Sequence, residues 1–156
     1  MKMQLATLVI SLNTLLVSAA PAPVNFAGHW TFDSAHSSNV GMMAQGQIQT
    51  VITQTKTKVV VDDTSIFNGQ TDTQHTVYNL TGRAVTNLSI MAGQATTRSH
   101  WDATRLVTEW ESPGAIAGTV SRRTETRYLS ADGETMFVES GRPGKEPVIM
   151  VFARAK

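Results

Sequence analysis

Cysteine is absent from all 156 residues of the chain, and charged residues are scarce at 16%. Without disulfides, the fold has to be stabilised by core burial and backbone hydrogen bonds. The 13 Lys and Arg nearly balance the 12 Asp and Glu. A chain this close to neutral lacks the basic patch that nucleic acids and anionic membranes attract. We therefore expect neither of these partners.

Long apolar runs are also missing, except near the N-terminus. Lys2 precedes an apolar stretch, Leu5–Val17, and small residues follow it up to Ala19. This stretch is shorter than the ~20 residues of a transmembrane helix, and the order of charge, apolar segment and small residues is typical of a signal peptide. The sequence predicts a signal peptide over residues 1–19, with an N-terminal core helix as the alternative, and a single domain over residues 20–156.

The predicted cleavage also changes the charge. It removes Lys2, so that 13 − 1 = 12 basic residues face 12 acidic ones. An exported domain without disulfides is typical of bacterial envelope proteins. We therefore expect a secreted or periplasmic bacterial protein.

Beyond the N-terminus, short Thr- and Val-rich alternating runs are separated by glycine, Asn-Gly or Asp-Gly, which is typical of an all-β domain. The connections are too short for parallel crossovers, so neighbouring strands are expected to be antiparallel. Closure of such a sheet removes its exposed edges. We predict an antiparallel up-and-down β-barrel of 8–10 strands, and a two-sheet sandwich is the alternative. The predicted strands are Phe26–Asp33, Gln45–Gln54, Lys58–Asp63, Thr73–Leu80, Ala84–Met91, Ala95–Asp102, Arg105–Glu111, Thr119–Ser130, Glu134–Ser140 and Pro147–Arg154.

Three connections stand out. Asp132-Gly133 is a strong hairpin signal, whereas Asn68-Gly69 is expected inside a longer loop. The segment Ser34–Ala44 does not read as a strand and lies where a barrel opening can be covered. Methionine side chains adapt to varied apolar shapes, so Met42 and Met43 are expected to cover a ligand or, alternatively, to plug the barrel without one.

Gly28-His29-Trp30 at the start of the first strand resembles the lipocalins and their calycin relatives. In that group the tryptophan lies across the closed base of the barrel and an arginine of the last strand packs on its ring. The resemblance implies that Arg154 fills this position. A guanidinium over an indole contributes about 0.5–2 kcal/mol. Gly28, Trp30 and Arg154 are thus expected to be structural.

The order of three further elements is similar to small exported bacterial proteins with a lipocalin-like barrel. These elements are Trp101-Asp102, Leu106-Val107 and the hairpin Leu129–Gly133. The resemblance covers the chain from about Phe26 onward. The Thr-Asp-Tyr turn of lipocalins is missing, so no particular ligand follows from the resemblance.

No motif for metal binding or catalysis is evident. The histidines are scattered, without the spacing at which metal ligands converge. Neither a Gly-x-Ser-x-Gly elbow nor a phosphate-binding loop is present. We expect no catalytic residue, no metal and no cofactor. The four histidines are His29, His36, His75 and His100.

The strands Ala95–Asp102 and Arg105–Glu111 are the best candidates for a pocket wall, because alternate residues point to opposite faces. Their more apolar faces are expected to point inward. The predicted lining residues of these strands are Thr97, Ser99, Trp101, Leu106, Thr108 and Trp110.

The strand Thr119–Ser130 has charges on both faces, so its orientation is open. One face carries Arg122 and Tyr128, which we take as lining candidates, and the other carries Glu125 and Arg127. An inward Arg122 or Arg127 would favour a ligand with a carboxylate. The alternative is cross-strand pairing of these charges on the solvent face.

The sequence predicts a non-catalytic exported barrel that binds a small apolar or amphipathic molecule in its interior. Two alternatives stay open. One is a cofactor-free isomerase or hydrolase that uses Glu109, Glu125 or His100 in the cavity. The other is a structural or interaction module with a filled core.

Overall fold

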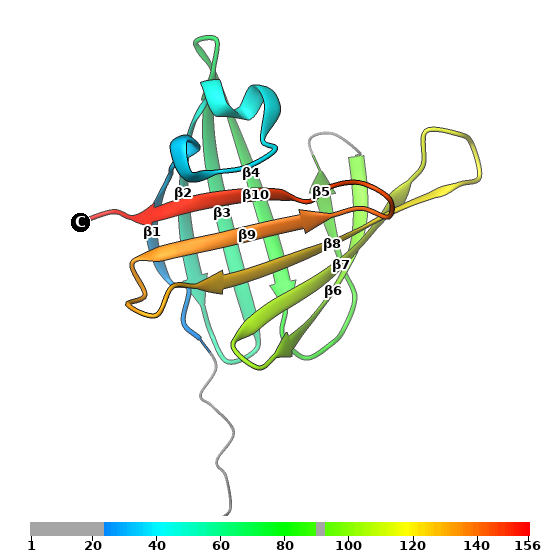
Figure 1. Ribbon diagram of the computed structural model, residues 1–156. Coiled ribbons are helices and arrows are strands. Elements are labelled where there is room, and N and C mark those ends of the chain that lie inside the picture. The colour runs from blue at the N-terminus through cyan, green and yellow to red at the C-terminus, as the bar shows by residue number, and fades with distance from the viewer. Residues whose placement is uncertain (1–23, 90–92) are drawn as a thin grey trace, which may run out of the picture.

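The computed structural model describes residues 24–89 and 93–156, which form ten antiparallel strands in one sheet (Figure 1). The predicted signal peptide, residues 1–19, lies outside the described residues. The strands are β1 (Gly28–Phe32), β2 (Gln47–Gln54), β3 (Lys58–Phe67), β4 (Gln70–Asn79), β5 (Val85–Ser89), β6 (Gly93–Asp102), β7 (Arg105–Pro113), β8 (Val120–Leu129), β9 (Thr135–Gly141) and β10 (Val148–Arg154). Two short 3-10 helices, η1 (Ser34–His36) and η2 (Gly41–Gln45), lie between β1 and β2.

The sheet curls into a nearly closed barrel because the first strand pairs with the last. Trp30 of β1 lies opposite Thr50 of β2 on one side and opposite Arg154 of β10 on the other. The strand order therefore runs from β4 through β1 and β10 to β5, so that β4 and β5 are the two free edges. The predicted up-and-down barrel is confirmed, and the alternative of two layers is wrong.

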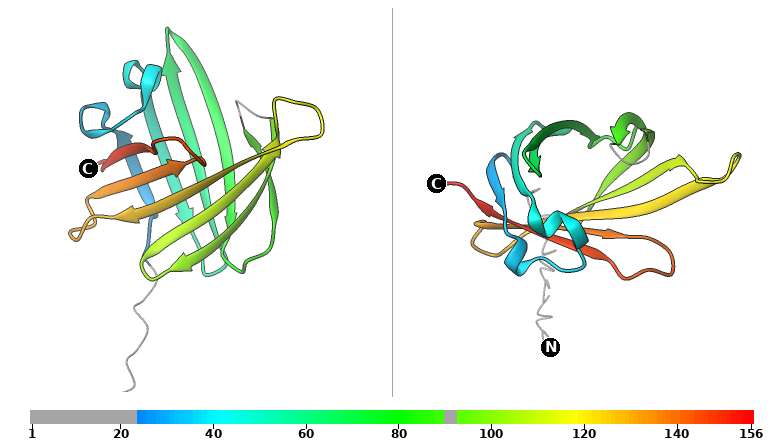
Figure 2. Two further views of the ribbon diagram at one scale, coloured as in Figure 1. Left: turned by 45° about the vertical axis from the view of Figure 1, so that its right-hand side comes forward. Right: turned by 90° about the horizontal axis from the view of Figure 1, so that it is seen from above.

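The alternation of strand direction gives the barrel two different ends (Figure 2). The connections β1–β2, β3–β4, β5–β6, β7–β8 and β9–β10 lie at one end, which we call the mouth. The other connections and both ends of the described chain lie at the opposite end, which we call the base. The helices η1 and η2 lie at the mouth, where the sequence predicts a cover.

Aromatic side chains fill the base. Phe26 stacks on Trp101 with ring centroids 5.9 Å apart, and both Phe26 and Trp30 are buried. The Trp30 indole N–H donates a hydrogen bond of 2.9 Å to the Phe26 carbonyl, so this large ring is buried without an unmet donor. The base is thus sealed by packed rings.

Arg154 holds the sealed base together. Its guanidinium lies 4.2 Å from the centroid of the Trp30 ring, as the resemblance implies. It also donates hydrogen bonds of 3.0 Å to the carbonyls of Ala27 and Gly133. One side chain therefore ties β10 to the segment before β1 and to the turn between β8 and β9.

The position of Arg154 explains why residue 28 is glycine. A Cβ atom at Gly28 would lie 2.7 Å from Nη1 of Arg154, and the φ angle of Gly28 is +137°. L residues rarely adopt this angle, and the close approach leaves no room for a side chain. The Gly-x-Trp pattern is therefore required by the arginine that crosses it.

The hairpin β3–β4 corrects one expectation about the connections. Both strands are longer than predicted, and Asn68-Gly69 forms the turn between them rather than part of a longer loop. The φ angles of Asn68 and Gly69 are 49° and 75°, which suits a two-residue hairpin turn with left-handed residues. The polar residues that precede the turn on β3 obscured the strand in the sequence, although they extend the ladder.

Arg154→Ala removes two hydrogen bonds and the contact with Trp30. We expect the free energy of unfolding to fall by about 1–3 kcal/mol. Urea denaturation followed by tryptophan fluorescence measures this loss, and Lys156→Ala, an exposed neighbour without these contacts, is the matched control. Equal stabilities of the two variants would contradict the role given to Arg154.

Candidate functional site

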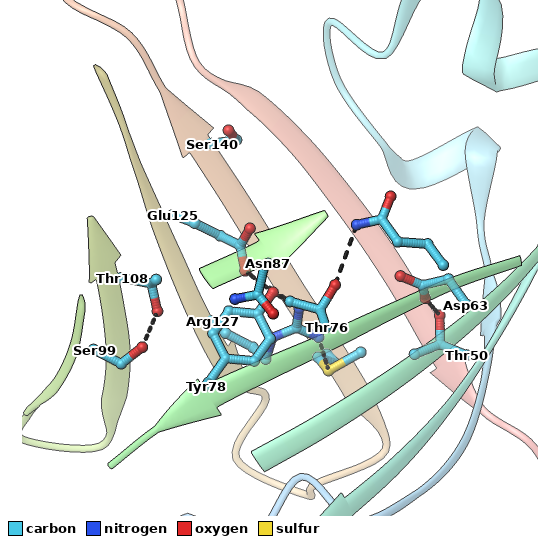
Figure 3. A network of polar contacts seen from close by, with 12 residues as sticks. Thr50, Asp63, Thr76, Tyr78, Asn87, Ser99, Thr108, Glu125, Arg127 and Ser140 are labelled. Carbon is cyan, nitrogen blue, oxygen red and sulfur yellow. Dashed lines mark hydrogen bonds and ion pairs between the residues drawn. The ribbon is translucent and has the colours of Figure 1, made fainter. Parts of the chain in front are cut away.

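The inner face of the barrel carries an unusual number of polar side chains (Figure 3). Strand alternation points every second residue inward, and on most strands at least one of these is polar. We call this set the polar wall. Its members are Thr50, Asp63, Thr76, Tyr78, Asn87, Thr97, Ser99, Thr108, Glu125 and Arg127.

Towards the base, the polar wall gives way to an apolar layer. Its buried members come from the N-terminal segment and from strands on all sides of the barrel. They are Phe26, Trp30, Ile52, Val59, Leu106 and Met136. The base is therefore apolar, whereas polar and apolar side chains alternate over the rest of the interior. Tyr78 and Arg127 lie opposite Val59 and Leu106 of the apolar layer. Phe32, Ile48 and Met150 pack against the core on the side of the mouth.

The structure settles the orientation of β8. Glu125 and Arg127 point inward and are each 6% exposed, whereas Arg122 and Tyr128 lie on the outer face. Arg122 pairs there with Glu111 at 2.7 Å, and Tyr128 stacks on Phe137. The prediction that Arg122 and Tyr128 line the interior is thereby corrected. Buried charges are tolerated on the inner face because they are paired.

The other predicted lining residues are distributed as follows. Thr97, Ser99, Leu106, Thr108 and Trp110 are buried on the inner face, on the paired strands β6 and β7. Trp101 is half-buried at the base against Phe26. Met42 and Met43 of η2 are 75% and 39% exposed at the mouth. Contact of any of these side chains with a ligand stays a prediction.

Arg127, Glu125 and Tyr78 form a buried polar cluster. Glu125 Oε1 accepts a hydrogen bond of 2.8 Å from the Tyr78 hydroxyl and lies 3.3 Å from Nη2 of Arg127. Burial raises the pKa of Tyr78 well above its usual range, and the neighbouring Glu125 carboxylate raises it further. Tyr78 therefore stays neutral and acts as a hydrogen-bond donor to Glu125.

A second arginine lies beside this cluster. The guanidinium of Arg123 lies 4.1 Å from the centroid of the Trp110 ring, and Nη1 is 3.9 Å from Oε2 of Glu125. Because Arg123, Glu125 and Arg127 are two residues apart on one strand, they share its inner face. Glu125 thus lies between two cations.

Asp63 adds a second carboxylate from the opposite wall. It accepts a hydrogen bond from the Thr50 hydroxyl, and burial raises the pKa of Asp63, partly offset by this hydrogen bond and by the charge of Arg127. Above the base, the charged side chains of the described residues that are buried or half-buried on the inner face are Asp63, Arg123, Glu125 and Arg127. Two positive and two negative charges make the interior neutral.

Two buried donors of the interior have no acceptor. Within residues 24–89 and 93–156, the buried side-chain nitrogens and oxygens without a hydrogen-bond partner are Trp110 Nε1 and Arg127 Nε. Trp110 is only 3% exposed, and its ring meets Tyr78 edge-on at a centroid distance of 6.2 Å. A buried donor without a partner costs about 1–3 kcal/mol.

The side chain of Asn87 bridges the two free edges of the sheet. Its Oδ1 accepts a hydrogen bond of 2.9 Å from the Val77 N–H, and its Nδ2 donates one of 2.9 Å to the Val77 carbonyl. In antiparallel pairs one residue exchanges both bonds with its partner, and here a side-chain amide takes the place of that peptide. Asn87 thus links β5 to β4 although no ladder joins them.

A groove of about 460 Å³ lies where β4 and β5 diverge. Asp63 and Gln74 belong to the inner face of their strands, whereas His75 and Leu88 point outward. The groove therefore reaches the polar wall through the gap between the strands. Its lining residues are Asp62, Asp63, Thr64, Thr73, Gln74, His75 and Leu88.

The residues considered for catalysis do not converge. Glu109 and His100 are exposed on the outer face of β7 and β6, and only Glu125 lies inside. No group of three or more potential metal-ligating side chains is found in the described part of the chain. None of the helices in residues 24–89 and 93–156 is long and apolar enough to cross a membrane.

Comparison with solved structures identifies similar barrels. Human cRBP IV superposes with a TM-score of 0.66 at 17% identity, covering 85% of this chain and 100% of its own. The REP1-NXSQ fatty acid transporter gives 0.63 at 12% identity, covering 83% and 96%. Apo lipid binding protein 8 of Caenorhabditis elegans gives 0.64 at 10% identity, covering 83% and 95%.

At these identities the comparisons establish the fold. The chain shares the barrel fold of these proteins, so the up-and-down barrel expected from the sequence is confirmed. Scans of protein-family profiles and of curated sequences find no match.

Asn87→Ala removes the amide that links β5 to β4. Because the Val77 N–H and carbonyl then lose their partner, we expect stability to fall by about 1–3 kcal/mol and hydrogen exchange at the Val77 amide to accelerate. Exchange measured by NMR and urea denaturation test this. Thr86→Ala, which changes an exposed residue of the same strand, is the control and is expected to alter neither quantity.

Proposed function

We propose that this protein binds a small amphipathic molecule inside its barrel and has no catalytic role. The observation that carries the proposal is the inner face itself, which combines buried polar side chains on most strands with an apolar layer at the base. Such a combination suits a ligand whose hydrocarbon part lies on the apolar layer and whose head group meets the polar wall. The structural neighbours support it, because two of them are described as a fatty acid transporter and a lipid binding protein.

A polar wall is costly wherever one of its buried groups lacks a hydrogen-bond partner, although the hydroxyls of Thr97, Ser99 and Thr108 have theirs. Thr97, Ser99 and Thr108 are buried on adjacent strands, where apolar side chains of similar size would pack without hydrogen-bond requirements. The Trp110 N–H finds no such partner among the described residues and carries this cost. A ligand that supplies an acceptor would recover part of that energy, which gives this N–H a function.

The mouth offers a route for the ligand. The exposed Met42 and Met43 of η2 lie there with Ile66, Leu88 and Ile116, all of them large and exposed apolar side chains. At the base, in contrast, Phe26 and Trp30 are buried. We therefore assign ligand access to the mouth.

We further infer that the chain is exported. The charge, apolar stretch and small residues of the segment 1–19 support a signal peptide. The protein would then act outside the cytoplasm, in the periplasm or medium, where a carrier keeps poorly soluble molecules in solution.

Filling the interior tests the binding proposal. We expect wild-type protein to bind the neutral dye Nile red and Ser99→Phe to bind it at least about tenfold more weakly, since the added ring takes the space proposed for the ligand. If that space is empty without ligand, Ser99→Phe should lose little stability. His100→Phe, the outward neighbour, is the matched control. Dye titration and thermal unfolding provide the measurements. The proposal fails if wild type binds no dye, or if Ser99→Phe loses about 1–3 kcal/mol of stability as overpacking of a filled core predicts.

Export is tested by expressing the full chain in a bacterium and measuring the intact mass of the periplasmic protein. The expected product begins at Ala20. Leu15→Arg places a charge in the apolar stretch, so the unprocessed chain should then stay in the cytoplasm. A wild-type chain that keeps residues 1–19 would contradict the proposal.

A further inference from the structure

We propose that the barrel selects ligands with a neutral, oxygen-bearing head group, such as an alcohol, aldehyde or ketone, over the same hydrocarbon chain ending in a carboxylate. This inference rests on the proposed function and specifies its ligand class. It follows from the balance of charges in the interior and from the donors that are left without acceptors.

The first step is the charge balance. Arg123 and Arg127 are matched by Asp63 and Glu125 on the same inner surface. Bringing in a carboxylate would add a buried negative charge without a counter-charge. The effective penalty for an unpaired buried ion is several kcal/mol, even after relaxation. A neutral head group avoids this penalty.

The second step is that Arg127, the deepest cation, is already occupied. Its Nη2 lies 3.3 Å from Oε1 of Glu125, and Nη1 contacts the sulfur of Met136 at 3.5 Å. A ligand carboxylate would have to displace Glu125, and Glu125 would then be buried beside a second anion. Like charges at such a separation strongly disfavour ionisation of both. The site is therefore poorly suited to an acid.

The third step concerns the two donors without acceptors. Trp110 Nε1 and Arg127 Nε belong to side chains that both contact the Tyr78 ring, the indole edge-on at 6.2 Å and the guanidinium carbon at 5.5 Å from its centroid. Both donors therefore belong to side chains that pack against the Tyr78 ring in the barrel interior. A carbonyl or hydroxyl oxygen has two lone pairs and accepts hydrogen bonds without bringing charge. A neutral oxygen is therefore the acceptor that suits these two donors.

The test compares two fluorescent probes with one hydrocarbon chain, cis-parinaric acid and cis-parinaryl alcohol. The buffer is mildly alkaline to favour the charged form of Asp63, because burial raises the pKa of this side chain. The increase in the emission of the polyene reports binding directly. We expect the alcohol to bind at least about tenfold more tightly than the acid. Trp110→Phe keeps an aromatic ring at this position, although a smaller one, and removes the N–H. It should weaken binding of the alcohol by about five- to tenfold and leave binding of the acid nearly unchanged.

Charge variants provide the reciprocal test. Glu125→Gln and Asp63→Asn each leave the interior with one excess positive charge, from opposite walls of the barrel. Each should improve binding of the acid on the order of tenfold and narrow or reverse the preference for the alcohol. Glu111→Gln removes a carboxylate from the outer face, where it pairs with Arg122, and should change neither affinity. Circular dichroism confirms folding, and Asp63→Asn suffices if Glu125→Gln does not fold.

The outcomes separate the two proposals. The inference is supported if wild type binds the alcohol more tightly than the acid and if the charge variants bind the acid more tightly than wild type does. If the acid binds wild type as well as or better than the alcohol, the inference is wrong while interior binding stands. If neither probe nor Nile red binds, the proposed function fails and the inference fails with it.

Discussion

The pairing of β1 with both β2 and β10 is the constraint on which the rest of the molecule depends. It brings Arg154 of the last strand over Trp30 of the first, and it closes a ten-stranded sheet into a barrel with a sealed base. In a flat sheet, both the polar and the apolar side chains of the inner face would be exposed to water. Closure makes that face the interior of the barrel, where each buried donor and each charge requires a partner. The chemistry of the interior follows from this enclosure.

Within this interior, the protein places charge where a simple core would avoid it. Arg127 is acceptable because Glu125 and Tyr78 surround it, and Asp63 and Arg123 complete a balanced set. Buried ion pairs rarely add stability, because desolvation costs as much as the attraction returns. Their presence on the inner face of β8 fits the ligand recognition that we propose. In our proposal, two positive and two negative side chains disfavour binding of a further charged group, while their N–H groups can still donate hydrogen bonds to a neutral ligand oxygen.

The sequence predicted the architecture well because each strand is punctuated by residues with a definite turn preference. The inner faces of β6 and β7 could also be predicted from the sequence, since Trp101, Leu106 and Trp110 mark the apolar side of each strand. The orientation of β8 could not be predicted, because Arg127 and Arg122 have the same hydropathy although they lie on opposite faces. A usable signal did exist. Opposite charges two residues apart on a strand share a face, so Glu125 and Arg127 can neutralise each other when that face is buried. Asn87 gave no signal, because its role depends on where two strand edges meet in space.

The link through Asn87 has a mechanical consequence. Elsewhere the wall is held by ladders of backbone hydrogen bonds. Between β4 and β5, the described residues show no ladder, and the side-chain amide of Asn87 spans the opening to Val77. This boundary is a seam, and parting it breaks two hydrogen bonds rather than a ladder. The barrel can therefore open locally between β4 and β5 while the packed base stays intact. Local widening for a ligand then does not require global unfolding.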